Sequence, residues 1–433
     1  MTIRLTMAAA VAAMAAACGA AELDVGADKP LKRIEDALAR AGAGDVIRVH
    51  PGPGNGAYEK VALYVDRPRL TIRAVGPQRI KLCGQGFDYS GRGRTPRAIV
   101  QFNPGADGCV LEGFELYGAR NGSFNGAGVR INQANDVTVR NCDIHDNDMG
   151  IMSNGNGTQA PGRNQLIESC LIRSNGTTRH PGYNHNLYLG GTSVTLRGCD
   201  IHSSVTGHNI KSRAHLTRVL GCYVHDSSNR EMDLVDGQGD TSAPGSDAVV
   251  AGCVIVKARA CKGNRAVIHF GQDGGKGHDG TLYLVHNTIV TPYIGAVADL
   301  SAPRARARIV NNIVWNGGQR QNGQKLLQPP KGAQPRDAAR GETNYLSAGF
   351  AGDGIAFLTG TILAPPDHQP PFVAPDKGDY RLRAADPAVT AAGSPVDDEL
   401  RKALDGPLLE YVHPLQTRER KLSGKGDLGA YSR

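Results

Sequence analysis

The sequence predicts an all-β solenoid, and a repeated phrase carries most of that prediction. An apolar strand ends in Asn, Ser or Gly, Cys follows, and an aliphatic residue comes two positions later. The phrase occurs as NCDIH, SCLIR, GCDIH, GCYVH and GCVIV, with cysteines at positions 142, 170, 199, 222 and 253. Their separations of 28, 29, 23 and 31 residues are too irregular for an array of helical hairpins. Coils of short strands joined by loops of variable length fit them better.

Alternation within each phrase gives the second observation. Cys142 and Ile144 share one face of a strand, while Asp143 takes the other face. The chain also has 56 glycines and little helical periodicity after the first 45 residues. We therefore expect one main β domain in which a column of inward side chains runs along the solenoid axis.

The first 21 residues have the pattern of a secretory signal. Arg4 precedes an Ala/Met-rich run over residues 5–17, and Gly19 and Ala21 have the spacing that a signal peptidase accepts. We expect export to the periplasm or the medium. Lipidation of Cys18 is an alternative. No other segment is long and apolar enough to span a bilayer, so stable membrane insertion is not expected.

The rest of the chain divides into three parts. Residues 22–44 form an N-terminal cap, in which Ile34, Ala37 and Leu38 lie on one face of a short amphipathic helix. Residues 45–320 carry the coils. Residues 321–433 are rich in Gln, Pro and Ala at first and form an irregular segment and a closing cap. A helix at the end of a solenoid would cover its open apolar core.

The eight cysteines after Cys18 admit two interpretations. Export favours disulfides, and Cys253 and Cys261 are the best-spaced pair. Five of the cysteines, however, occupy the same position in successive repeats. A stack of buried thiols that act as small apolar residues is the simpler interpretation.

The formal net charge of +8 suggests an anionic partner. The Lys and Arg residues are scattered, and neither a nucleic-acid motif nor a series of stacking aromatics accompanies them. We expect a monomer that binds an acidic polysaccharide and no nucleic acid.

Consecutive strands in the centre of the chain carry unusual outward chemistry. Aligning Leu187, Ile210, Met232 and Ile268 as an inward column makes the following residues an outward column. Neighbouring strands lie about 4.8 Å apart, so side chains one to three coils apart span one or two sugar rings. We take as catalytic candidates Tyr188, His208, Lys211, Arg213 and Asp233, and as substrate-binding candidates Arg130, His185, Asn186, Asn209, Arg230, Glu231 and His269. Of these, Asn186, Asn209 and Glu231 are expected to form a second outward row.

The chain resembles a known group, the exported right-handed parallel β-helix proteins that act on polysaccharides, or pectate lyase-like superfamily. The resemblance rests on the opening helix before GDVIRVHPG, the NCDIH-type coils, and the closing YRLRAADPAVTAAGS and DLGAY. It covers nearly the whole mature chain and implies a right-handed single-stranded parallel β-helix. The group includes lyases, hydrolases, epimerases and non-catalytic surface proteins, so its fold does not fix the reaction.

A lyase is the interpretation we favour. It needs cations that neutralise a uronate carboxylate, a base for the adjacent ring proton, and an acid for the leaving oxygen. Arg130 and Arg213 could neutralise, Lys211 or His208 could remove the proton, and Tyr188 could serve as base or acid. The KS dipeptide at Lys211 is similar to that of the chondroitinase B and alginate lyase group, which implies a partner Arg on the next coil, here Arg230.

That group binds calcium through acidic residues just upstream of the Lys. The corresponding residues here are Ser203, Ser204, Val205 and Thr206, so we expect no cofactor by that route. The loop GQDGGKGHDG, which begins at Gly271, is the remaining calcium candidate, although its spacing matches no known calcium loop.

Two other functions stay open. A glycoside hydrolase on the same scaffold would use Glu231 and Asp233 as its pair of carboxylates, with Asp236 nearby. A non-catalytic glycan-binding solenoid would use an extended polar face. Simpler roles are also available to the candidates: Lys211 and Asp233 as a cross-strand ion pair, and Asn186 and Asn209 as a structural ladder.

Overall fold

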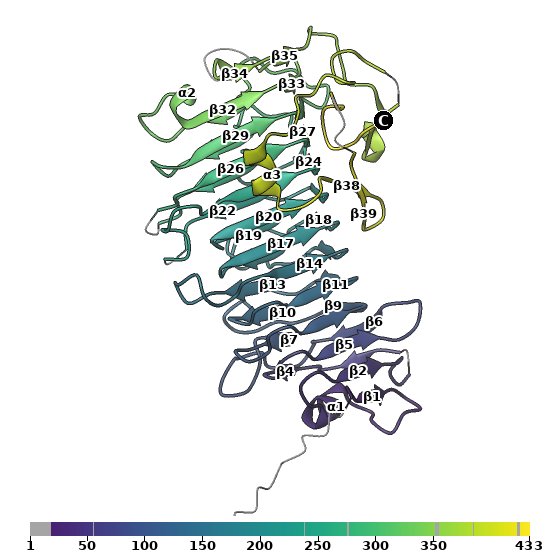
Figure 1. Ribbon diagram of the computed structural model, residues 1–433. Helices are drawn as coiled ribbons and strands as arrows, with labels where there is room; N and C mark the ends of the chain where they lie inside the picture. The colour runs from purple at the N-terminus through teal and green to yellow at the C-terminus, as the bar shows by residue number, and fades with distance from the viewer. Residues whose placement is uncertain are drawn as a thin grey trace, which may run out of the picture.

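A computed structural model describes residues 19–54, 56–237, 239–274, 277–350, 355–383, 385–421 and 425–433. Their strands pair in parallel into three long sheets, and the chain passes from sheet A to sheet B to sheet C and back in each coil. The result is the expected right-handed parallel β-helix, an elongated column in Figure 1. The proposed signal segment and Cys18 lie almost wholly outside the described residues.

The strands of each sheet follow one another up the column. Sheet A consists of β1 (Glu22–Val25), β2 (Val46–Val49), β5 (Thr71–Ala74), β8 (Val110–Glu112), β11 (Thr138–Arg140), β14 (Gln165–Glu168), β17 (Ser193–Arg197), β20 (Leu216–Leu220), β23 (Ala248–Ala251), β26 (Thr281–Val285), β29 (Arg306–Val310), β32 (Ala339–Glu342) and β34 (Leu358–Thr359). Sheet B consists of β3 (Tyr58–Glu59), β6 (Ile80–Cys83), β9 (Phe114–Tyr117), β12 (Asp143–His145), β15 (Leu171–Arg173), β18 (Asp200–His202), β21 (Tyr223–His225), β24 (Val254–Val256), β27 (Thr288–Val290), β30 (Ile313–Trp315), β33 (Tyr345–Leu346) and β35 (Ile362–Leu363). Sheet C consists of β4 (Leu63–Val65), β7 (Ala98–Phe102), β10 (Ala127–Asn132), β13 (Met149–Asn154), β16 (Leu187–Leu189), β19 (Ile210–Ser212), β22 (Met232–Val235), β25 (Ile268–Gly271), β28 (Ala298–Leu300) and β31 (Leu327–Gln328).

The repeated phrase marks the bend between sheets A and B. The residue before each inward Cys has a left-handed backbone, with φ of 55° at Asn141, 52° at Ser169 and 60° at Gly198. Glycine adopts that conformation without strain, and Asn tolerates it better than most residues. This requirement explains why the phrase begins with Asn, Ser or Gly.

The inward column after that bend is a stack of thiols, as expected. The thiols of Cys142, Cys170, Cys199, Cys222 and Cys253 are free and fully buried. No disulfide joins cysteines in the described ranges, so the suggested bridge between Cys253 and Cys261 is wrong. The column continues as an amide ladder, because Asn287 donates through Nδ2 to Oδ1 of Asn312 at 3.0 Å.

The N-terminal end is capped as the sequence predicts. Helix α1 (Ile34–Arg40) buries Ile34, Ala37 and Leu38 against the first coil and lies at the bottom of the column in Figure 1. The coils extend beyond the expected 45–320 in both directions, because β1 already belongs to sheet A and β35 still belongs to sheet B.

The C-terminal segment returns along the side of the column. It contains a 3-10 turn (Pro375–Lys377), α3 (Asp398–Leu404), and the antiparallel pairs β36 (Phe372–Ala374) with β37 (Asp379–Leu382) and β38 (Leu409–Val412) with β39 (Gln416–Glu419). Helix α2 (Pro335–Ala338) lies instead in the last coils, directly before β32. Leu400 and Leu404 of α3 pack on the outer face of sheet A beside β23 and β26. Figure 1 shows this segment beside the middle coils.

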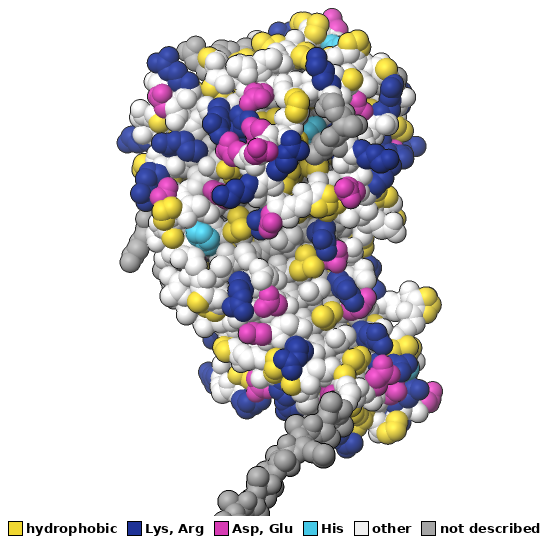
Figure 2. Space-filling view, in the orientation of Figure 1, with side chains coloured by type: hydrophobic (Ala, Val, Ile, Leu, Met, Phe, Trp, Pro, Cys, Tyr) yellow, Lys and Arg dark blue, Asp and Glu magenta, His cyan; other side chains and the backbone are white. Residues whose placement is uncertain are grey.

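The molecular surface mixes both signs of charge. Lys and Arg side chains alternate with Asp and Glu over the face that Figure 2 shows, so the net positive charge is not gathered into one patch on that face. Among the described residues, no helix is long and apolar enough to cross a membrane.

Candidate functional site

The predicted outward column is confirmed by the strand register of sheet C. Tyr188 of β16 lies opposite Lys211 of β19, and Lys211 lies opposite Asp233 of β22. His269 of β25 continues the row. The inward residues Leu187, Ile210, Met232 and Ile268 are fully buried. Period-two alternation in parallel strands therefore places these polar side chains side by side on the outer face.

Asp233 is the centre of the row and is surrounded by donors. Its carboxylate accepts from Lys211 Nζ at 2.9 Å, His269 Nδ1 at 2.8 Å and Arg230 Nη1 at 3.3 Å. His208 Nε2 lies 3.5 Å away. Burial raises the pKa of Asp233, but the hydrogen bond from His269 and the nearby His208 and Lys211 outweigh burial and hold that pKa well below its usual value. Asp233 is thus an ionised anchor for the surrounding side chains.

A second carboxylate joins the two main cations of the site. One oxygen of Asp273 accepts from Lys211 Nζ at 2.7 Å and from Arg213 Nη2 at 2.5 Å. Asp273 lies after β25, and its side chain is 44% exposed, whereas Lys211 and Arg213 are 10% and 24% exposed. Lys211 and Arg213 therefore form a carboxylate-binding pair that a solvent-accessible loop residue occupies.

Tyr188 lies next to this pair. Arg213 Nε donates to the Tyr188 hydroxyl at 3.0 Å, and the guanidinium carbon lies 5.9 Å from the ring centroid. Tyr188, Arg213 and Asp273 border a concavity of about 430 Å³ that Asp236 and Asp240 also line. A phenolic hydroxyl, a guanidinium and three carboxylates thus border one hollow on the outside of sheet C, and the Lys211 ammonium reaches it only through its bond to Asp273.

The two histidines that precede the strands are buried, not exposed. His185 and His208 stack with their ring centroids 5.0 Å apart, and their residues are 2% and 6% exposed. His185 Nδ1 accepts from the backbone N–H of His208. Burial lowers the pKa of His185 well below its usual value and lowers the pKa of His208 to about 4, although Asp233 opposes the shift of His208. The expectation that His185 contacts substrate is therefore wrong, because the ring is buried. His208 is a buried neighbour of the Asp233 carboxylate.

The expected second outward row is also wrong, because Asn186, Asn209 and Glu231 are fully buried. Asn186 donates to Asn209 Oδ1 at 2.9 Å, and Asn209 donates to Glu231 Oε2 at 2.7 Å. Each residue lies just before its strand, where the chain still bends, so the alternation of the strand does not reach it. They form an interior ladder and cannot bind substrate.

Three further candidates lie on the outer face. Arg230 is bound to Asp233 and lies 3.8 Å from Asp299, and His269 Nε2 contacts the Ser301 hydroxyl at 2.7 Å. Arg130 is in the same column but two coils below Tyr188, where its Nη2 donates to Asn154 Oδ1 at 3.2 Å. Arg230 and His269 thus belong to the cluster, and Arg130 does not.

Two acidic residues of the site escaped the sequence analysis. Asp299 follows His269 in the column, and extending the alignment by one strand to AVADL would have found it. Asp273 lies in the GQDGGKGHDG loop, which suggested calcium. In the structure Asp236 accepts from the backbone N–H groups of Asp273 and Gly277, and Asp273 binds cationic side chains. Both carboxylates are thus engaged with protein donors.

Comparisons with known proteins agree with this fold. Residues 127–318 match a family model described as a right handed beta helix region. The chain is similar to the crystal structure of pectate lyase Pel9A, with a TM-score of 0.53 and 15% identity over 95% of this chain and 96% of that chain. It also matches the PL6 family polysaccharide lyase from Pseudopedobacter saltans (TM-score 0.43, 12% identity, 84% of this chain and 96% of that one) and pectin methylesterase PemA from Erwinia chrysanthemi (TM-score 0.35, 11% identity, 76% and 90%). No curated protein sequence matches the chain significantly.

Proposed function

We propose that the protein is an exported enzyme that cleaves an acidic, uronate-containing polysaccharide by β-elimination. The observation that carries this proposal is the carboxylate of Asp273 held between Lys211 and Arg213. A binding pair that accepts a carboxylate from the protein's own loop has the chemistry to accept one from a uronate. Tyr188, the proton-transfer group that an elimination also needs, lies beside Arg213.

In the proposed reaction a uronate carboxylate displaces Asp273 and is neutralised by Lys211 and Arg213. Neutralisation makes the proton on the carboxylate-bearing ring carbon removable. In this scheme the phenolate form of Tyr188 takes that proton, and Arg213 Nε donates a hydrogen bond to the Tyr188 oxygen. The carbon's electron pair forms a double bond to the next ring carbon, whose bond to the glycosidic oxygen breaks. That oxygen then receives a proton from Tyr188.

Lys211 has a more limited role than the sequence suggested. Its Nζ donates to both Asp233 and Asp273, so it is arranged as a cation and not as a base. Asp233 holds Lys211 and His269 in place and acts as a positioning residue.

The alternative hydrolase lacks its pair of carboxylates. Glu231 is fully buried in the ladder, and Asp233 is 2% exposed and enclosed by donors. Neither side chain reaches a sugar oxygen or an attacking water, as general acid and base must. A glycan-binding solenoid without catalysis remains the second candidate, because the same carboxylate site would serve it.

The test is incubation of the mature protein with alginate, pectate, glucuronan and glycosaminoglycans. β-Elimination creates a double bond that raises the ultraviolet absorbance, a hydrolase creates reducing ends without it, and a binding protein creates neither. Tyr188→Phe should lower turnover by about 10²- to 10⁴-fold, the usual contribution of a general acid or base. Tyr64→Phe is the matched control, because Tyr64 lies in the same column of sheet C on β4, far from Lys211. Full activity of Tyr188→Phe would remove Tyr188 from the mechanism.

A further inference from the structure

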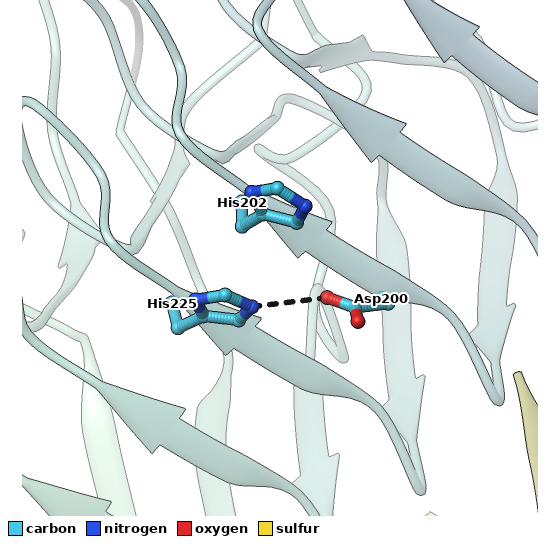
Figure 3. Close-up of side chains that lie close together, drawn as sticks. All are labelled: Asp200, His202 and His225. Atoms are coloured by element: carbon cyan, nitrogen blue, oxygen red, sulfur yellow. Dashed lines mark hydrogen bonds and ion pairs between the residues drawn. The ribbon is translucent and has the colours of Figure 1, made fainter. Parts of the chain in front are cut away.

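A second group of ionisable side chains lies on sheet B, away from the proposed carboxylate site. Asp200 and His202 are the outward residues of β18, and His225 of β21 lies directly opposite His202. One ligand atom from each of the three lies within 4.8 Å of the others. His225 Nε2 is 3.1 Å from Asp200 Oδ1. In Figure 3 the imidazoles lie nearly parallel, and each has a nitrogen on the side of the Asp200 carboxylate.

The orientation of both rings is fixed by the residue that follows each strand. His202 Nδ1 contacts the Ser203 hydroxyl at 2.9 Å, and His225 Nδ1 contacts the Asp226 carboxylate at 2.7 Å. Ser203 and Asp226 both have left-handed backbones, with φ of 55°. This bend turns their side chains back onto the rings and leaves Nε2 of each ring for the cluster. Histidines that bind metals are usually held this way, with the second nitrogen on an oxygen of the protein.

An earlier coil repeats the sequence without repeating the arrangement. NCDIH at residues 141–145 places Asp143 and His145 where GCDIH places Asp200 and His202. On the coil after the first phrase the residue opposite His145 is Arg173, whose Nη2 binds Asp143 at 3.0 Å. On the coil after the second phrase that position is His225. Arg173 therefore closes the first site. It also lies opposite His202, but its guanidinium is bound to Asp143, and on the other side of His202 the second site has an imidazole that can coordinate a metal.

We propose that Asp200, His202 and His225 bind one divalent transition-metal ion, with Zn²⁺ as the best-matched ion. Two imidazole nitrogens and one carboxylate oxygen form a donor set that zinc accepts, with a water in the fourth position. Around a tetrahedral zinc with bonds of about 2.0 to 2.1 Å, neighbouring ligand atoms lie about 3.3 Å apart. The pair formed by His225 and Asp200 already has nearly this spacing. The ligand atom of His202 lies within 4.8 Å of both, so a small shift of the whole His202 side chain would bring in the third ligand. Asp200 is 9% exposed and His202 is half-buried, so an ion can enter from solvent.

The buried ladder connects this site to sheet C. Asn186 Nδ2 donates to the backbone carbonyl of His202, and Asn209 Nδ2 donates to that of His225, both at 2.7 Å. These asparagines precede Tyr188 and Lys211 by two residues. A metal that joins the coils of His202 and His225 would therefore also hold together the turns from which Tyr188 and Lys211 emerge.

The test is direct binding of Zn²⁺ to the full chain after removal of metals with EDTA. Competition with a chromophoric chelator should give one equivalent per chain. His202→Ala and His225→Ala should each weaken binding by at least about 100-fold, and Asp226→Asn by about 10- to 100-fold, as loss of a histidine's supporting oxygen does elsewhere. His145→Ala is the matched control and should bind Zn²⁺ like the unchanged protein. Co²⁺ bound to the unchanged protein should give the visible absorption of a four-coordinate site. In His202→Ala and in His225→Ala, the spectrum should change as expected for the loss of one nitrogen ligand.

Uptake of less than one equivalent by the unchanged protein would overturn the proposal. An equal loss in His145→Ala and His202→Ala would also overturn it, because binding would then be scattered over surface histidines. Circular dichroism and the melting temperature must show that each variant is folded. If His225→Ala does not fold, His202→Ala and Asp226→Asn decide the question, since His202 is half-buried and Asp226 is exposed. None of these measurements depends on the reaction proposed for sheet C.

Discussion

The outer row and the inner ladder start two residues apart on the same three turns, yet they have opposite environments. Tyr188, Lys211 and Asp233 face outward from sheet C, whereas Asn186, Asn209 and Glu231 are fully buried. The ladder uses two neutral amides, each of which donates and accepts, and ends at the Glu231 carboxyl, so that burial leaves few polar atoms unpaired. The row concentrates charges beside a concavity that Tyr188 and Arg213 border. Polar side chains just before each strand of sheet C therefore stabilise the interior, whereas polar side chains within the strand are available to a ligand.

The largest effect is expected in the outer row, where loss of Lys211 should reduce activity. Lys211→Ala should lower β-elimination by about 10²- to 10³-fold, since it removes a charge aimed at the carboxylate. The melting temperature and circular dichroism should change little, because Asp233 keeps His269 and Arg230 as donors. Lys81→Ala, at an exposed position of sheet B, is the control. Unchanged activity in Lys211→Ala would show that the row does not carry the chemistry.

The ladder should give the opposite pattern. Lys257 Nζ lies 3.9 Å from Glu231, and both side chains are fully buried. Burial raises the pKa of Glu231 to about 7, so above that pH Glu231→Gln leaves the Lys257 ammonium without its carboxylate partner. There we expect a loss of about 3 to 5 kcal/mol in the free energy of unfolding. Urea denaturation measures this loss. The kcat of the folded fraction should stay within a few-fold, and a selective loss of kcat with normal stability would mean that Glu231 acts on substrate.

The contribution of His208 to the free energy of unfolding should fall as the pH drops from about 6.5 to 4. Burial lowers the pKa of His208 to about 4, below that of an unfolded histidine, so the unfolded chain binds more protons in this window. The stability that the neutral His208 ring contributes is fully present above pH 6.5 and is lost as the pH falls through 4. His208→Gln should reduce the loss by about 3 kcal/mol, and urea denaturation at each pH measures it. His180→Gln, at an exposed ring, should keep the original slope, and an equal change in both variants would contradict the assignment.

The smallest effect concerns the loop carboxylate that occupies the site. Asp273→Asn removes a competitor for Lys211 and Arg213, so uronate oligosaccharides should bind a few-fold more tightly, by calorimetry or by a lower KM. Little stability should be lost, because an exposed ion pair contributes about 0 to 1 kcal/mol. Weaker binding in Asp273→Asn would show that Asp273 contacts the substrate itself.

The repeat predicted the column almost completely. Cys142, Ile144 and Leu187 lie inward as expected, because strict alternation in a strand leaves no other choice. The placement of Tyr188, Lys211 and Asp233 follows from the same rule. The rule fails at Asn186 and Asn209, since both lie before the first paired residue of their strands, Leu187 and Ile210.

The contact of Asp273 with Lys211 could not be predicted in the same way. It joins residues 62 positions apart through a loop, and loop conformation has no periodic signal in the sequence. The zinc site was missed for a different reason. His202 and His225 each end a strand in a phrase that we had assigned only to the stack of buried thiols.

The amide of Asn186 has one more consequence, which concerns how such a protein diversifies. Its Oδ1 accepts from both the backbone N–H and the Nδ2 of Asn175, each at 3.0 Å, and so fastens together the two ends of the excursion between them. Doubling the length of a loop whose ends are fixed costs only about 0.6 kcal/mol. Insertions and deletions in this loop can therefore accumulate during evolution and change the surface around a bound polymer. The position of the coil that carries Tyr188 would not change.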